Sequence, residues 1–148
     1  MCEYRYLKAN YESTVDWHTA EDYLRCSPSF HGHLWQDFVI VQRPEGQIMF
    51  AQILLVFKFT FANVEYSLAL VQPYNKPIAS HSRPKKDCDL GFLQVRSAAR
   101  TSSDFIFVDS IVRGALLVDA RDHGGDKLVV DIIDTDMFLC LRGFHSRG

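Results

Sequence analysis

The clearest pattern of apolar and polar positions lies in residues 48–72, IMFAQILLVFKFTFANVEYSLALVQ. The block has no Pro or Gly and is rich in Val, Ile, Phe and Tyr, which favour strands. From Phe57 to Phe61, Phe alternates with polar residues, and this period of two indicates a strand with one buried and one partly wet face. The block therefore predicts two long strands joined at Ala62 and Asn63, with Asn63 at positive φ.

Shorter apolar runs outside this block predict further strands. A turn is expected at 43–46, where Pro and Gly supply fixed and permissive backbone angles, and another at 119–126. Asp109 and Ser110 resemble a cap before a single helical turn at 111–113. The predicted strands cover 35–42, 92–96, 105–108, 115–118, 127–133 and 137–142.

These elements predict an all-β fold with little helix, because β-α-β alternation, heptads and internal repeats are missing from the sequence. We expect a small, partly open β-barrel, since closing a bent sheet protects its edges. The barrel is expected over 34–142 and a frayed tail over 143–148. Residues 1–33 are expected to form an extension of mixed loop and short helix, with Thr19 as N-cap and Asp22 three residues on.

Composition narrows the class of protein. The chain has 148 residues, 47% hydrophobic and 23% charged, as expected of one globular domain. A net charge of −2 argues against non-specific DNA binding over the whole surface but leaves room for a local basic patch. The sequence has no apolar leader, no run long enough to span a membrane and no C-x-x-C pair. We expect an intracellular protein, nuclear or cytoplasmic, with reduced thiols, no cofactor and no membrane association.

The leading binding candidate is the long loop at 73–91, because loops of this length in compact domains are often functional. It carries a basic cluster, and further basic residues follow nearby. Phosphates or an acidic peptide would suit such a group, whereas a solvated loop is the alternative. The candidate residues are Tyr74, Arg83, Lys85, Lys86, Arg96 and Arg100.

Two metal sites are weaker candidates. His31 and His33, with Cys26 upstream, have side chains that zinc accepts, but their spacing matches no standard structural site and an exposed loop explains them better. Three carboxylates near a strand end would suit Mg²⁺ in a hydrolase, although Asp is also common in turns. They are Asp131, Asp134 and Asp136.

The remaining chemistry is aromatic. Four aromatic side chains could form a cation-binding cage, or they could be ordinary core residues. They are Trp17, Trp35, Tyr66 and Tyr74. The sequence contains neither a G-x-S-x-G elbow nor a Gly-rich phosphate loop, so nucleophilic catalysis and nucleotide binding have no motif in their favour.

The order of features from Phe50 to Leu141 resembles a bromo-adjacent homology (BAH) domain. The strings FAQILLVFKF, LALVQPY, FVDSIVRGALLV and FLCL resemble successive strands of that family. The chain is also similar to uncharacterised β-rich segments of fungal transposon-associated proteins, in which strings such as ALVQPY recur. The BAH resemblance implies a non-catalytic module that binds nucleosomes, histone tails or partner proteins.

Three functions are therefore expected in order. The first is a non-enzymatic binding module, associated with chromatin or nucleic acid through the basic loop. The second is a protein-interaction or self-assembling domain of a transposon-derived polypeptide, which would use an exposed apolar strand; a homodimer is one form of such an assembly. The third is a small metal-dependent hydrolase that uses Asp131, Asp134 and Asp136.

Overall fold

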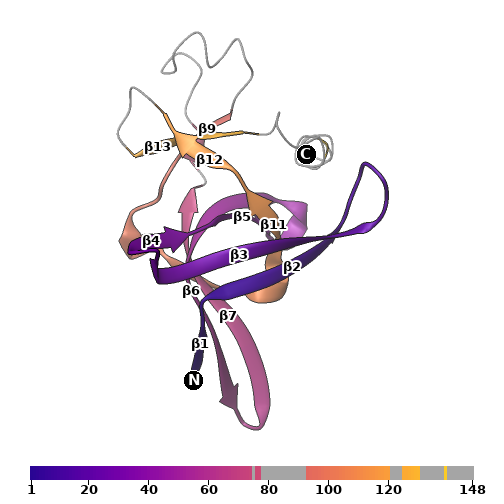
Figure 1. Cartoon of the computed structure of the whole chain (residues 1–148), viewed down its shortest axis with the longest axis vertical. Helices are drawn as coiled ribbons and strands as arrows, with labels where there is room; N and C mark the ends of the chain where they lie inside the picture. The colour runs from indigo at the N-terminus through magenta and orange to yellow at the C-terminus, as the bar shows by residue number, and fades with distance from the viewer. Residues whose placement is uncertain (75, 78–92, 121–124, 131–138, 140–148) are drawn as a thin grey trace.

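The computed structural model of the chain describes residues 1–74, 76–77, 93–120, 125–130 and 139 (Figure 1). About 70% of the described residues lie in strands, which confirms the all-β class. Short 3₁₀ turns η1 (Pro44–Gly46), η3 (Arg100–Ser102) and η4 (Val108–Ser110) connect some of them. The strands are β1 (Cys2–Tyr4), β2 (Tyr6–Glu12), β3 (Thr19–Phe30), β4 (His33–Gln36), β5 (Phe38–Gln42), β6 (Ile48–Phe61), β7 (Val64–Tyr74), β8 (Lys76–Pro77), β9 (Leu93–Arg96), β10 (Asp104–Phe107), β11 (Ile111–Ala115), β12 (Leu117–Asp119) and β13 (Asp126–Val129).

The central sheet has the strand order β10-β7-β6-β5-β11, with β1 added to the distal part of β6. Its longest element is the predicted β6–β7 hairpin. Ala62 and Asn63 form the two-residue turn, with φ of 48° and 62°, as hairpins with right-handed strand twist require. The distal half of this hairpin projects away from the other strands, with β1 beside it (Figure 1).

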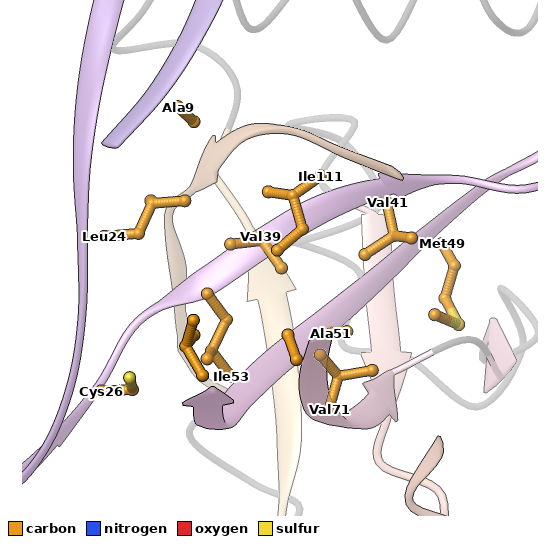
Figure 2. Close-up of a cluster of buried hydrophobic side chains, with 12 residues drawn as sticks. Ala9, Leu24, Cys26, Val39, Val41, Met49, Ala51, Ile53, Val71 and Ile111 are labelled. Atoms are coloured by element: carbon orange, nitrogen blue, oxygen red, sulfur yellow. The ribbon is translucent and has the colours of Figure 1, made fainter. Parts of the chain in front are cut away.

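Two smaller sheets lie on the two faces of the central sheet and give the molecule three layers. One is β2-β3-β4 and the other is β12-β13-β9-β8. On the first face, Leu24 and Cys26 of β3 belong to the same buried cluster as Val39 and Ile53 of the central sheet (Figure 2). On the second face, Val95, Leu117 and Val129 of the small sheet pack with residues of the central sheet that point the other way. The buried ones are Ile40, Phe50 and Tyr74.

The N-terminal helix is a prediction that the structure overturns. Thr19 opens strand β3, not a helix, and β3 pairs with β2 from Thr19↔Glu12 to Arg25↔Tyr6. Burial along β3 follows a period of two, with Leu24 and Cys26 inside and Tyr23 and Arg25 outside. Contacts with the central sheet therefore override the local capping signal. Residues 1–33 contribute strands and core side chains.

The predicted barrel is not found, because the sheets described do not close on themselves or on one another. One reason lies at Asp37, where the strand predicted over 35–42 divides into β4 and β5, which join different sheets. The Asp37 carboxylate accepts hydrogen bonds from Arg25 N at 2.6 Å and from Trp35 Nε1 at 2.8 Å. Stacked layers, rather than closure, bury the apolar faces here.

The predicted helical turn at 111–113 is also wrong. These residues open strand β11, which pairs with β5, and the turn lies just before them in η4. The strands predicted at 127–133 and 92–96 correspond to β13 and β9 within the described part of the chain. Most of the strand predicted at 137–142, and the tail at 143–148, lie outside the described residues. In the part of the chain that the structure describes, we find no helix with the length and hydropathy of a membrane span.

Candidate functional site

Only part of the predicted basic site lies among the residues that the structure describes. Arg83, Lys85 and Lys86 lie outside the described residues. Tyr74 is buried, with its ring edge-on to that of Phe38 at 5.3 Å between centroids, so it packs in the core. Arg100 is exposed in η3. Binding through this loop remains a prediction.

Arg96, the remaining member of the predicted basic group, forms an ion pair with Asp126. Its guanidinium donates two hydrogen bonds to Asp126, from Nε to Oδ1 at 2.7 Å and from Nη2 to Oδ2 at 3.1 Å. Gln94 Nε2 lies 3.3 Å from the same carboxylate. The hydrogen bond and the charge of Asp126 raise the pKa of Arg96. This group holds β9 to β13 and partly neutralises the charge that was expected to meet a ligand.

The candidate metal ligands do not gather within the described residues. His31 and His33 are exposed at the β3–β4 turn, and the described part of the chain contains no group of three or more His, Cys, Asp or Glu placed to hold a metal ion. Cys26 points into the core and its thiol lies 3.2 Å from the carbonyl oxygen of Tyr4. Asp131, Asp134 and Asp136 lie outside the described residues.

The four aromatic residues proposed for a cage have separate surroundings. Trp17 is exposed in the β2–β3 turn, and Trp35 packs edge-on to Phe30 at 5.4 Å. Tyr66 stacks on Phe59, and Tyr74 is in the core beside Phe38. These four residues therefore do not form a cage.

The structure instead shows an apolar surface on the projecting part of the central sheet, which we name the Phe face. The strand register places its members on one side of β6, β7 and β10, opposite the side that packs under β3. Nearer the base of the hairpin, the small sheet β12-β13-β9-β8 covers this side; farther out it is open. The members are Leu55, Phe57, Phe59, Phe61, Val64, Tyr66, Leu68, Leu70, Phe105 and Phe107.

Ring contacts organise the Phe face. Phe59 and Tyr66, opposite one another on β6 and β7, stack at 5.3 Å with 22° between their planes. Phe57 lies 6.3 Å from Phe59 and stands edge-on to Phe105 at 5.9 Å. Such pairs restrict ring motion and are worth about 0.5–1.5 kcal/mol beyond area burial. The face is therefore ordered before any partner arrives.

The other side of the same hairpin is polar. Lys58 Nζ lies 2.8 Å from Glu65 Oε1, and the hydrogen bond to Glu65 raises the pKa of Lys58. Thr60 is exposed beside them. The projecting hairpin is thus amphipathic, and Tyr66 carries the one hydroxyl among the members of its apolar side.

The alternation of Phe57, Phe59 and Phe61 with polar residues was the signal for this surface. It predicted one buried and one wet face, and it did not show that the hairpin extends beyond the layers that would cover its apolar face. Phe105 and Phe107 repeat the pattern on β10, and only the pairing with β7 brings them to the same side.

Comparison with protein-family models, with curated proteins and with solved structures found no match to this chain. The resemblance to BAH domains therefore stays a prediction.

Proposed function

We propose that this chain is a non-enzymatic interaction module that assembles with a second copy of itself through the Phe face. The observation that carries the proposal is the exposure of large rings on an ordered sheet surface. Phe61, Phe105 and Phe107 are 68%, 60% and 58% exposed. Isolated apolar residues on a surface are ordinary, but a contiguous group of this kind marks an interaction site.

The size of the face is adequate for the apolar centre of a dimer interface. The three most exposed rings alone present roughly 350 Å² of apolar surface. Val64 and the half-buried members bring the face to the upper end of the range of patches on monomeric proteins, about 600 Å². A stable interface buries about 800 Å² on each partner, including a polar rim. The polar residues bordering the hairpin can supply that rim.

A second copy suits this face better than an unrelated charged partner does. The register places no charged residue of β6, β7 or β10 on this side over the length of the Phe face, and the neighbouring strand β1 contributes one, Glu3, which pairs with Phe57. Apolar, charge-poor interface centres are typical of homodimers. Two copies related by a two-fold axis would place the same aromatic surface against itself, packed like the two sheets of a sandwich.

Light scattering coupled to size-exclusion chromatography tests the proposal. The wild-type chain should elute with a mass near twice 17.0 kDa, and the mass should persist at high salt because apolar association is not screened. A double substitution, Phe105→Lys with Phe107→Lys, should give a monomer. A wild-type monomer at all accessible concentrations would overturn the proposal.

A matched control lies on the same hairpin. Phe61→Lys should weaken the dimer, whereas Thr60→Lys adds the same charge one residue away on the polar side and should leave the mass unchanged. Because all the substituted residues are exposed, far-ultraviolet circular dichroism should match the wild type. Equal loss of the dimer in Phe61→Lys and Thr60→Lys would show that charge on the hairpin, not the Phe face, governs assembly.

A further inference from the structure

The outward side of the N-terminal sheet presents a second surface, which we name the aromatic–arginine face. Strand alternation sends Tyr6 of β2 and Tyr23 and Arg25 of β3 away from the core, and Tyr6 is paired directly with Arg25. Tyr6 is 64% exposed and Tyr23 is 58% exposed. The complete face consists of Arg5, Tyr6, Tyr23, Arg25, Phe30 and Trp35.

A groove of about 440 Å³ lies on this face. Its floor and walls combine rings and guanidinium groups with two hydroxyls, those of Ser27 and Ser29. Ser27 Oγ donates a hydrogen bond to the Ser29 carbonyl oxygen at 2.9 Å. The groove is therefore lined by groups that recognise flat rings and anions.

Arg25 is held over two rings. Its guanidinium carbon lies 5.1 Å from the centre of the Phe30 ring and 5.9 Å from that of Trp35. Trp35 is fixed in turn by the hydrogen bond from its Nε1 to Asp37. This packing orders a long side chain in advance and lowers the entropy cost of a bound state.

The charges of the face leave two cations available. Lys8 pairs with Glu21 at 2.6 Å, which raises the pKa of Lys8, and its Nζ also lies 5.9 Å from the centre of the Tyr23 ring. Asp37 is engaged by Trp35 and the Arg25 backbone. Within the described residues, neither Arg5 nor Arg25 has a carboxylate within ion-pair distance of its guanidinium. Both groups remain placed to meet phosphates along the groove.

We propose that the aromatic–arginine face binds a single-stranded nucleic acid, with bases stacked on Tyr6 and Tyr23 and phosphates paired with Arg5 and Arg25. Exposed rings beside arginines on a sheet surface are suited to unpaired bases, because every base offers a π face. An acidic peptide would use the arginines but would leave Tyr6 and Tyr23 without a stacking partner. A duplex keeps its bases stacked inside and cannot reach the rings.

The test is fluorescence anisotropy with a labelled single-stranded oligonucleotide, in DNA and RNA forms, against a duplex of the same sequence. We expect the single strands to bind more tightly than the duplex. The logarithm of the binding constant should fall with that of salt concentration with a shallow slope of roughly −1.4, as two phosphate contacts give. Binding of duplex or of inorganic polyphosphate as tight as that of the single strands would overturn the proposal.

Substitutions separate stacking from charge. Tyr23→Ala should weaken binding by about 5- to 100-fold, as loss of one stacked base does, and Tyr23→Phe should restore most of the affinity. Trp17→Ala is the matched control, because Trp17 is 72% exposed in the β2–β3 turn and does not line the groove. Equal effects of Tyr23→Ala and Trp17→Ala, or no effect of Tyr23→Ala, would overturn the assignment of the site.

Discussion

The backbone N–H of Gly114 donates a hydrogen bond of 2.8 Å to Asp22 Oδ2, across 92 positions of the sequence. Asp22 lies on β3 of the N-terminal sheet and Gly114 on β11, at the edge of the central sheet. The same carboxylate oxygen lies 3.7 Å from Arg113 Nε. This acidic side chain therefore adds polar contacts to the apolar packing of Leu24 and Cys26, and together they hold the N-terminal sheet, with its aromatic–arginine face, on the rest of the molecule.

Gly114 allows this close approach because it has no side chain. A Cβ at this position would lie 3.0 Å from Leu24 Cδ2 and 3.2 Å from Asp22 Oδ2. We expect Gly114→Ala to destabilise the protein by about 1–3 kcal/mol in urea unfolding, as overpacking does. Where room exists, the same change stabilises a protein by about 0.4–1 kcal/mol. A stabilised variant would therefore show that β3 does not pack tightly on β11.

Self-association through the Phe face should also be visible in thermal unfolding. A dimer that dissociates on unfolding has a midpoint that rises with protein concentration. We expect this rise for the wild type and for Thr60→Lys, and a midpoint independent of concentration for Phe105→Ser with Phe107→Ser. Differential scanning fluorimetry over a range of protein concentrations measures how the midpoint changes. A concentration-dependent midpoint in the double Ser variant would point to an interface elsewhere.

Cys26 should make stability depend on alkaline pH. Burial raises the pKa of its thiol above the usual 9.0, so the unfolded chain loses this proton at lower pH than the folded protein does. At pH values below the pKa of the thiol in the unfolded chain, the thiol is neutral in both states and adds no pH dependence to the stability. Above that value the unfolded state is favoured, and the free energy of unfolding falls as pH rises.

The matching variant is Cys26→Ala, which removes the titrating group. We expect the drop in the free energy of unfolding between about pH 8 and pH 10 to be smaller in Cys26→Ala than in the wild type. Other Cys, Tyr and Lys residues titrate in both proteins and cancel in the comparison. Identical drops would mean that Cys26 ionises equally easily in the folded protein.

The pair Arg96–Asp126 should stabilise the small sheet. Asp126 is 1% exposed, and Arg96 gives its carboxylate two hydrogen bonds. We expect Arg96→Met to lower the free energy of unfolding, because the substitution removes two hydrogen bonds to a buried carboxylate. Arg96→Lys should recover part of this, since Lys keeps the charge but not the two-pronged geometry. Chemical denaturation measures both, and a double-mutant cycle with Asp126→Asn isolates the pair.

Much of the fold could be predicted from local pattern. The β6–β7 hairpin and its turn at Ala62 and Asn63 follow from strand propensity and from a residue that accepts positive φ. The helix at Thr19 was wrong because a capping signal spans only a few residues, whereas β3 is fixed by pairing with β2 and by packing on β11. The division of the predicted strand at Asp37 likewise depends on contacts with Arg25 and Trp35.

The sequence by itself determined that this is a β protein and which side chains alternate along each strand, because strand geometry sends neighbours to opposite faces. Only the tertiary structure decided which of those faces is covered. Phe50 and Phe61 lie on the same side of β6, yet Phe50 packs in the second buried cluster, whereas Phe61 is exposed on the Phe face. Coverage depends on contacts between residues far apart in the chain, and those contacts have no local signature.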